Sequence, residues 1–278
     1  MRIRLTLIPH RNTVLPINYG YFLTGIIYSF LSQASENYSR FLHDEGYHLD
    51  DSRAFKLFTF SMLQARSFRI RGDSIFFPSH VTGAQQPRDG SPSNRISWYI
   101  TSPVQEFIQH LVSGIFAEGQ TIHVGPQEST AAFSIEHVET LAPPSFTECM
   151  DLTCLAPITI SKPSESPAPA GKKSYCRYLR PWEEGFSEAV GNNLARKYRL
   201  MHDRQPPDGP FTLIPDAEYV AKKRGRITKK ISFKGTDIIG FMAPCAVTGP
   251  PALIEVGYET GFGDKNSLGF GMVKEIAS

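Results

Sequence analysis

The chain has 278 residues, a formal net charge of +2, 41% hydrophobic residues and 20% charged residues. This composition is ordinary for a globular protein, the length suits one large domain or two of modest size, and the charge is too small to indicate a partner by itself. Because no apolar run approaches the roughly 20 residues of a membrane span, no membrane association is expected. The N-terminus lacks the apolar core of a signal peptide, and the four cysteines form no CxxC pair. We therefore expect a cytoplasmic protein with reduced cysteines.

The first half of the chain alternates between strand-like and helix-like patterns. Residues 1–11 alternate charged and apolar side chains, as a strand does. An apolar stripe predicts a helix over residues 17–34, followed by a further turn or two that stops at Gly46. The remaining elements are predicted as strands at 55–63 and 67–77 with a turn at Gly72-Asp73, a loop at 80–97, a strand at 97–102, a helix at 103–118, and strands at 120–125 and 131–141.

The second half of the chain repeats this scheme. Its predicted elements are a strand at 146–161, a loop at 162–173, a helix at 182–202, a long basic hairpin over 219–235 that turns near Gly225, a strand at 236–247, a helix at 251–261 and a last strand at 269–276. Each half thus has the order β, α, β-β, α, β, which matches the ferredoxin-like unit. The predicted fold class is α+β, with two tandem ferredoxin-like (RRM-like) domains over residues 1–143 and 144–278.

The stretch "VGYETGFGDKNSLGFGMVKEI" near the C-terminus concentrates glycine around two copies of Gly-Phe-Gly. A dinucleotide-binding fingerprint requires a strand before the glycines and a helix after them, and a Walker A loop requires Gly-Lys-Ser/Thr, so neither motif fits. Two interpretations remain. The glycines could form a helix-to-strand turn with several left-handed residues. Alternatively, backbone N–H groups could approach a phosphate chain, with Lys265 supplying charge and Asn266 and Ser267 supplying donors. The second interpretation predicts RNA contacts from Gly261, Gly263, Lys265, Asn266, Ser267, Gly269 and Gly271.

This pattern of Gly-hydrophobic-Gly, a short spacer with a basic residue, and Gly-hydrophobic-Gly resembles the C-terminal loop of the CRISPR-associated repeat-processing endoribonucleases of the RAMP superfamily. The stretches "LPINYGYFLTGIIYSFL" and "FLHDEG…FKLFTFSML" resemble the first helix and second strand of the same family. The resemblance implies two ferredoxin-like domains and a metal-independent RNase without a cofactor. Such an enzyme cuts each repeat of a precursor CRISPR transcript and releases guide RNAs for an effector complex.

The resemblance also implies which residues carry the chemistry. Cleavage by the neighbouring 2′-hydroxyl leaves a 2′,3′-cyclic phosphate and a 5′-hydroxyl, and it requires an acid, a base and a donor that stabilises charge on phosphorus. Family members place a Tyr on the first helix, a His soon after it and a Lys at the following strand, which Tyr28, His43 and Lys56 match. His43 would be general acid or base, Tyr28 would orient or share proton transfer, and Lys56 would stabilise the phosphorane. The link before Lys56 is long, and His48 within it is an alternative to His43.

Each of these residues also has an ordinary interpretation. Tyr28 could be a half-buried Tyr whose hydroxyl group contacts water, His43 could cap a helix end, and Lys56 could be a solvated surface residue. No metal site is predicted, because a His-x4-His loop without a carboxylate framework is a weak signal.

The predicted basic hairpin carries Lys222, Lys223, Arg224, Arg226, Lys229 and Lys230 without an acid among them. A charge run is often just a solvated face. Beside an RNA-binding loop it is expected to hold the phosphate backbone of CRISPR repeat RNA, in both the precursor and the mature guide. Lys172, Lys173, Arg177 and Arg180 form a second candidate patch. The main alternative function is a non-catalytic RNA-binding subunit of a CRISPR effector complex, and a more distant one is a general nucleic-acid-binding protein. The sequence leaves open attachment to an effector complex and a homodimer.

Overall fold

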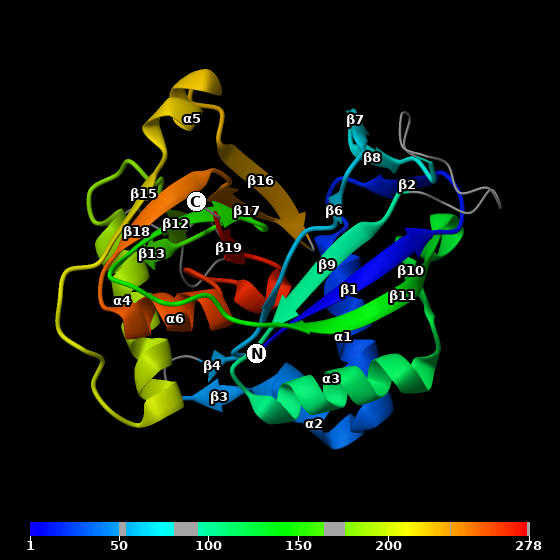
Figure 1. Ribbon diagram of the computed structural model, residues 1–278, viewed down its shortest axis with the longest axis horizontal. Coiled ribbons are helices and arrows are strands. Elements are labelled where there is room, and N and C mark those ends of the chain that lie inside the picture. Colours follow the sequence, from blue (N-terminus) through cyan, green and yellow to red (C-terminus); the bar gives the residue numbers. More distant parts are fainter. Residues whose placement is uncertain (50–53, 81–93, 164–175, 234, 277–278) are drawn as a thin grey trace, which may run out of the picture. The chain divides into compact units, whose positions relative to one another are not determined.

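The computed structural model describes residues 1–49, 54–80, 94–163, 176–233 and 235–276 (Figure 1). The chain splits into two compact units, of which unit 1 comprises Met1–Gly46 and Phe60–Pro143 and unit 2 comprises Tyr47–Thr59 and Pro144–Ser278. Most of the predicted loops at 80–97 and 162–173, together with Lys172 and Lys173, lies outside the described residues. The segment 47–59 belongs to unit 2 although the chain on both sides of it belongs to unit 1.

Unit 1 is built on a sheet with the strand order β10-β11-β1-β9-β5, in which β6 also pairs with β9. Alternate side chains such as Leu5, Trp98 and Phe133 are fully buried, so one face of the sheet carries the core of the unit. Helices α1 and α3 pack against each other beside this sheet (Figure 1). The bounds are β1 (Arg2–Pro9), α1 (Gly20–Ala34), β5 (Thr59–Phe60), β6 (Gln64–Ala65), β9 (Ile96–Thr101), α3 (Gln105–Glu118), β10 (Thr121–Val124), η2 (Gln127–Ser129) and β11 (Ala131–Leu141).

The helices of unit 1 form where the apolar spacing predicts them. The stripe of α1 buries Leu23, Ile27, Phe30 and Leu31. After it come α2 (Glu36–Arg40) and a π-helical turn η1 (Phe41–Glu45), which ends at Gly46 with φ of 76° as expected for a terminal glycine. A smaller sheet joins β2 (Thr13–Pro16), β8 (Ser74–Phe77) and β7 (Arg69–Arg71).

The predicted strand at 55–63 is wrong as a continuous element. β4 (Ala54–Phe55) pairs with β3 (Tyr47–His48), and the chain then leaves the strand conformation before β5. The reason is local, because Leu57 adopts φ of 51°, in the left-handed region that cannot continue a strand.

Unit 2 has the sheet order β15-β18-β12-β19, and its core includes the fully buried side chains of Leu152, Val190, Leu194 and Val247. Helices α4 and α6 contact each other. The unit also has three two-stranded pairs, β3-β4, β13-β14 and β16-β17. The bounds are β12 (Cys149–Cys154), β13 (Ser161–Pro163), β14 (Cys176–Tyr178), α4 (Phe186–His202), β15 (Thr212–Pro215), α5 (Ala217–Lys222), β16 (Thr228–Phe233), β17 (Thr236–Phe241), β18 (Pro244–Thr248), α6 (Pro251–Thr260), η3 (Asn266–Leu268) and β19 (Val273–Glu275).

The prediction of a long basic hairpin that turns near Gly225 is also wrong. Its first half is the helix α5, because the Asp216 carboxylate accepts from the Tyr219 N–H at 2.6 Å and caps the helix. Arg224 and Gly225, with φ of 51° and 72°, end this helical segment. Only β16 is a strand, and it pairs with β17 after a turn. The predicted strand at 236–247 is therefore two strands, and the edge strand β15 was not predicted.

Candidate functional site

Tyr28 and His43 lie together in a pocket of unit 1. Tyr28 projects from α1 and His43 from the turn η1, with ring centroids 5.4 Å apart at an angle of 80°. Both line a pocket of about 240 Å³ that also includes Ser32 and Asp44. His43 Nδ1 lies 2.7 Å from Asp44 Oδ1, a distance at which an Nδ1–H donates to the carboxylate and orients the imidazole ring. The His43 side chain is 70% exposed, and its imidazole can therefore exchange protons with solvent or a bound substrate.

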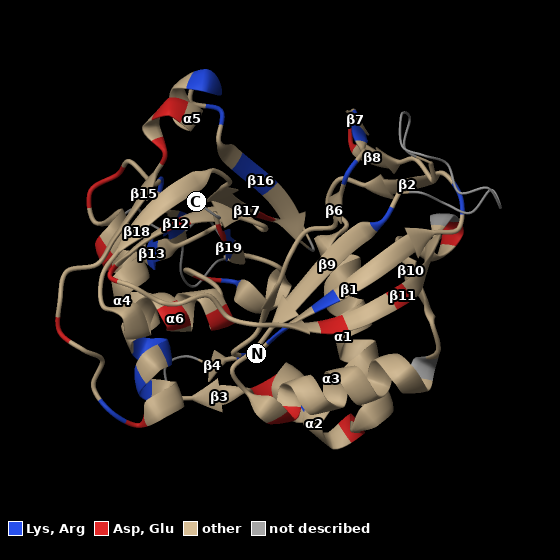
Figure 2. Ribbon diagram, in the orientation of Figure 1, with Lys and Arg blue, Asp and Glu red and all other residues tan. Residues whose placement is uncertain are grey.

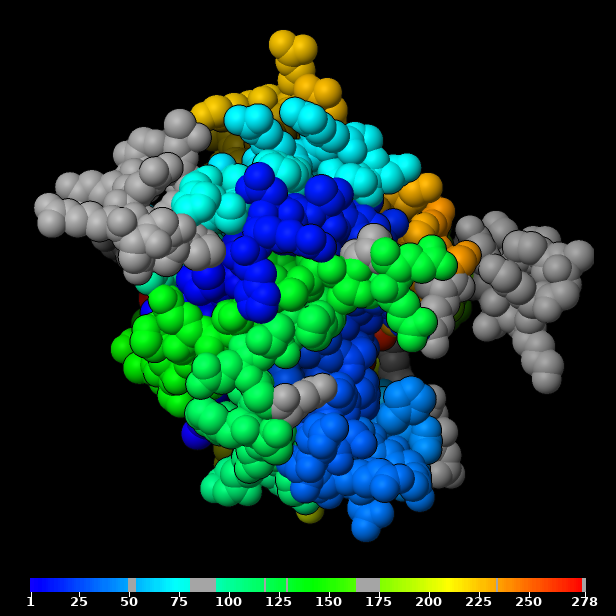
Figure 3. All heavy atoms as spheres, turned by 90° about the vertical axis from the view of Figure 1, so that its right-hand side faces the viewer, coloured from blue at the N-terminus to red at the C-terminus, as the bar shows by residue number. Residues whose placement is uncertain are grey.

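Burial and charge determine the protonation of Tyr28. Burial, with a smaller contribution from the Asp44 carboxylate, raises the pKa of Tyr28 to about 12. Tyr28 is therefore a neutral phenol near pH 7 that can donate a hydrogen bond. A hydrogen bond links α2 to α1 at this position, because Ser39 Oγ donates to the Tyr28 carbonyl oxygen at 3.3 Å. In Figure 3 the blue segment that contains α2 and the following turn lies at the molecular surface.

Lys56 lies in unit 2, where it lines a pocket of about 260 Å³ together with the glycine-rich loop. Lys56 is half-buried, and Lys265, which lines the same pocket, is exposed. The structure thus brings Tyr28 to His43 within one unit and Lys56 to the loop within the other. His48 is exposed on β3, opposite Ala54 of β4, and belongs to the same hairpin that leads into Lys56.

The glycines between α6 and β19 are required by close packing. Gly261, Gly263, Gly269 and Gly271 all have φ between 75° and 89°. A Cβ at Gly263 would lie 2.1 Å from the Thr159 carbonyl oxygen, and one at Gly271 would lie 2.1 Å from the Phe262 carbonyl oxygen. The N–H groups of Gly261, Gly269 and Gly271 donate to backbone carbonyls of unit 2. These contacts favour the first interpretation, in which the glycines shape a left-handed turn.

The spacer between the two Gly-Phe-Gly copies has an outward and an inward part. Lys265 is exposed and Ser267 is half-exposed, so both side chains can reach a ligand. The Asn266 side chain is engaged within the loop: its Nδ2 lies 3.0 Å from the Phe270 carbonyl oxygen and its Oδ1 lies 2.7 Å from Lys197 Nζ. Asn266 therefore serves the loop conformation.

Sequence reasoning missed the residues behind this loop. Lys197 and Asn193 of α4 and Asp264 of the loop are each at most 2% exposed. A signal was present, because Lys197 continues the apolar stripe formed by Val190 and Leu194. A lysine at such a position is buried only when it has partners.

The basic segment of unit 2 is exposed throughout. Figure 2 shows its charge at the end of α5 and along β16. Lys230 forms an ion pair with Asp237 at 3.2 Å, so Asp237 partly neutralises its contribution to the positive charge of the segment. The exposed basic residues are Lys222 on α5, Lys223, Arg224 and Arg226 in the following turn, and Lys229 and Lys230 on β16.

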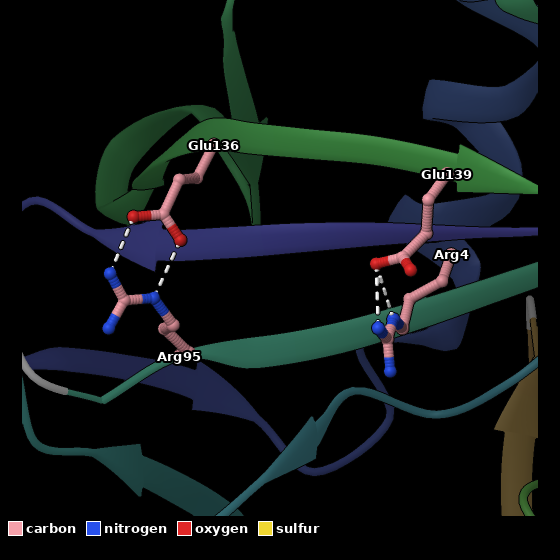
Figure 4. Close-up of polar contacts among 4 residues, drawn as sticks. All are labelled: Arg4, Arg95, Glu136 and Glu139. Carbon is pink, nitrogen blue, oxygen red and sulfur yellow. Dashed lines mark hydrogen bonds and ion pairs between the residues drawn. The ribbon is translucent and has the colours of Figure 1, made fainter.

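Arginines on the sheet of unit 1 are placed differently. Figure 4 shows Arg4 beside Glu139 and Arg95 beside Glu136, with closest N···O distances of 2.7 Å and 2.6 Å. The hydrogen bond from Arg95 lowers the pKa of Glu136, so the carboxylate stays charged and neutralises its partner. Arg4 and Arg95 are thus paired within the protein.

Two further properties of the described part of the chain bear on function. No helix there is long and apolar enough to span a membrane. Within the same residues, no three His, Cys, Asp or Glu side chains converge as metal ligands would.

Comparison with known proteins supports the resemblance noted in the sequence. The family model "CRISPR-associated protein Cas6, N-terminal" matches residues 14–132, and "CRISPR associated protein Cas6, C-terminal" matches residues 141–275. "CRISPR-associated endoribonuclease Cas6 1" of Methanocaldococcus jannaschii is 32% identical over 277 residues, which cover 99% of this chain and 93% of the relative. This chain belongs to the Cas6 family.

Other Cas6 proteins show the same full-length similarity. "CRISPR-associated endoribonuclease Cas6" of Pyrococcus furiosus is 26% identical, with 99% of this chain and 89% of the relative covered. A solved structure of a Cas6-related protein from Pyrococcus furiosus superposes with a TM-score of 0.78 at 24% identity, covering 99% of this chain and 98% of that one. A further Cas6 structure has a TM-score of 0.70 at 28% identity and covers 100% and 99% of the two chains. The mixed α and β architecture described above is therefore that of Cas6 proteins.

Proposed function

We propose that this Cas6-family chain is an endoribonuclease that cleaves CRISPR repeat RNA in precursor transcripts to release guide RNAs. The observation that carries the proposal is the Tyr28–His43 pair, in which an exposed imidazole oriented by Asp44 lies beside a neutral phenol. Metal-free RNA cleavage requires proton transfer, and a positioned imidazole is the side chain that most often supplies it. The relatives named above are endoribonucleases, which supports the same activity here.

In the proposed reaction the ribose 2′-oxygen attacks its neighbouring phosphorus while the bond to the 5′-oxygen breaks. His43 removes the 2′-hydroxyl proton or donates one to the leaving 5′-oxygen, and the other of these two transfers is made by water or by Tyr28, which orients the reacting group or shares the proton transfer. Lys56, together with the glycine-rich loop of unit 2, stabilises the additional negative charge on phosphorus. The products are a 2′,3′-cyclic phosphate and a 5′-hydroxyl, and no metal ion or cofactor takes part.

We also assign each unit the ferredoxin-like topology. The main strands of unit 1 are β1, β5, β9 and β11 in chain order. Across the sheet they lie in the order β11-β1-β9-β5, so the fourth strand of the chain comes first, followed by the first, the third and the second. The strands β12, β15, β18 and β19 of unit 2 lie in the same order. With α1 and α3 in one unit and α4 and α6 in the other, this order supports two βαββαβ units.

The proposed substrate contacts are electrostatic. Lys265, Ser267 and the exposed basic segment of α5 and β16 would hold phosphates of the repeat RNA. Neutralising about four phosphates would give a log–log salt slope of roughly −3 for single-stranded RNA. Attachment to an effector complex and a homodimer stay predictions from the sequence.

The decisive experiment maps the ends of repeat RNA after incubation with the protein in EDTA. The expected result is one cut per repeat, with a 2′,3′-cyclic phosphate on one fragment and a 5′-hydroxyl on the other. Repeat RNA with a single 2′-deoxy nucleotide at the cut position should bind but stay intact. Cleavage of that analogue, or loss of turnover in EDTA, would contradict the mechanism. Binding without any cleavage would favour the alternative of a non-catalytic RNA-binding subunit.

A further inference from the structure

A buried lysine on α4 holds the glycine-rich loop from behind. Lys197 is 2% exposed, and its Nζ lies 2.6 Å from the Gly261 carbonyl oxygen, 3.1 Å from the Gly263 carbonyl oxygen and 2.7 Å from Asn266 Oδ1. An ammonium group has three N–H donors, and these three acceptors can use all of them. These three acceptors belong to the loop, although Lys197 lies 64 to 69 positions earlier in the chain.

The second half of the same network holds Asp264. Its side chain is 2% exposed and accepts from the Ser161 N–H at 3.1 Å, from Ser161 Oγ at 2.8 Å and from Asn193 Nδ2 at 3.1 Å. Asn193 precedes Lys197 by one helical turn, so α4 presents an amide and an ammonium on the same face. One helix thus fixes two successive parts of the loop.

Burying these charges requires a compensating gain. An ammonium or a carboxylate is costly to remove from water unless it is fully hydrogen-bonded. The glycines of the loop around them have positive φ, and Lys265, which lies among these glycines, also has a positive φ, of 60°. Such a segment has many conformations available when it is unrestrained. The network selects one of them, in which Lys265 is exposed beside Lys56 in the lining of the same pocket.

We propose that Lys197 is a positioning residue that holds the glycine-rich loop in the conformation that binds RNA phosphate through Lys265. The inference deepens the proposed function and rests on it where RNA is concerned. It also assigns Asp264 and Asn266, between the two Gly-Phe-Gly copies, to this internal frame. Pre-organisation of this kind increases affinity because the loop need not be ordered when the ligand binds.

The first test concerns the loop alone and needs no RNA. Lys197→Met keeps an unbranched side chain but removes the ammonium group. We expect hydrogen exchange in peptides covering residues 259–272 to accelerate at least about tenfold, while peptides of β12 and β18 change less than about twofold. Lys274→Met, on the exposed Lys274 of β19, is the matched control and should leave loop exchange unchanged. Unchanged loop exchange in Lys197→Met would overturn the inference.

The second test measures coupling in RNA binding, with repeat RNA that carries a 2′-deoxy nucleotide at the cut position. Lys265→Ala should weaken binding about fivefold in the wild-type background and less than about twofold in the Lys197→Met background. A lysine that only stabilises the fold predicts equal effects in both backgrounds, and that result would overturn the positioning role. If the wild-type protein binds no repeat RNA, the proposed function fails, and the exchange experiment alone decides the role of Lys197 in the loop.

A milder variant keeps the test decisive if Lys197→Met does not fold. Asn266→Ala removes one acceptor of Lys197 and the amide donor to the Phe270 carbonyl, at a half-exposed position. The same exchange and coupling measurements apply, and the expected changes have the same direction.

Discussion

The pockets of the two units are constructed in opposite ways. In unit 1, His43 stands on a π-helical turn with most of its side chain exposed, and its orienting partner Asp44 is also at the surface. In unit 2, Lys197 of α4 holds the glycine-rich loop, and both Lys197 and Asp264 of the loop are almost completely buried. The difference corresponds to the proposed tasks. A group that exchanges protons must be accessible, whereas a loop that binds phosphate gains most from a fixed backbone.

The two units differ at one equivalent position of their shared strand order. In unit 1, α3 ends at Gly119 and the chain forms β10 and the short helix η2 before it reaches β11, the last main strand. In unit 2, the corresponding helix α6 ends at Gly261 and the chain continues through the glycine-rich loop before β19. The same strand order therefore carries an additional edge strand between helix and last main strand in one unit, and a packed loop in the other. What distinguishes them is the inward-facing polar side chains on α4.

The largest expected effect is the loss of catalysis in unit 1. His43→Ala should reduce the rate of cleavage at saturating repeat RNA about a thousandfold, because a positioned acid or base contributes about 10²–10⁴-fold. Affinity for the 2′-deoxy repeat RNA should change less than about twofold, since phosphate binding is assigned to unit 2. Single-turnover cleavage in EDTA measures the first effect, and filter binding measures the second.

His48→Ala is the matched control, because His48 lies on β3 of unit 2, whereas Tyr28 and His43 share a pocket of unit 1. Full activity of His43→Ala together with loss of activity in His48→Ala would transfer the role to His48.

The second effect is on stability and tests whether the loop of unit 2 is as tightly packed as its contacts indicate. Gly263→Ala places a Cβ 2.1 Å from the Thr159 carbonyl oxygen at a positive φ. We expect it to destabilise unit 2 by about 3 kcal/mol or more, because neither backbone can move without breaking the Asp264 N–H bond to the same carbonyl. Gly72→Ala, at φ of 55° with open space around it, is the control and should cost about 1 kcal/mol. Thermal unfolding compares them, and equal losses would contradict the packing argument.

Local patterns explain how much of the fold could be predicted. The stripes of α1 and α3 and the terminal glycines Gly46 and Gly119 depend on neighbouring residues alone, so the sequence is sufficient to locate them. The short edge strand β15 and the division between β17 and β18 depend on which distant strand each segment pairs with. The short stretch Ala217–Lys222 has no pattern that excludes either a strand or a helix, and the Asp216 cap stabilises the helix α5.

The same distinction holds for the site. Tyr28, His43 and Lys56 were selected through resemblance to a family, and the structure adds that the first two share a pocket while Lys56 shares another with the loop. The place of Lys197 on the apolar stripe of α4 indicated that it is buried but not what it contacts, because two of its partners are backbone carbonyl groups that face it only after the loop has folded. Backbone acceptors have no signature in side-chain patterns.

The third effect concerns the basic segment of unit 2. Replacing Arg224, Arg226 and Lys229 with Gln should weaken RNA binding about tenfold at moderate salt and reduce the magnitude of the log–log salt slope by about 2, since each phosphate contact contributes about 0.7. The matched control replaces Arg66, Arg69 and Arg71 of unit 1 with Gln, because all three are exposed and the change in charge is the same. Similar losses in both variants would show that only the total charge matters.

The smallest effect sharpens the description of the pocket in unit 1. Tyr28→Phe removes only a hydroxyl group, so cleavage should slow by less than about tenfold if Tyr28 orients the reacting group while His43 transfers protons. With a pKa of about 12, Tyr28 stays neutral through the pH range of the assay, and its removal should leave the pH–rate profile unchanged below pH about 10.

The raised pKa also predicts how the stability of the free protein depends on pH. The folded state favours the neutral phenol, so the contribution of Tyr28 is complete below the unfolded value of about 10 and is lost as pH rises toward 12. Between pH 10 and 12 the wild type should therefore lose about 1–2 kcal/mol more than Tyr28→Phe in denaturant unfolding. Parallel curves for the two proteins would mean that the phenol is solvated. Tyr28 would then resemble the exposed groups of its pocket, and only His43 and Asp44 would remain to distinguish the reactive unit from the binding one.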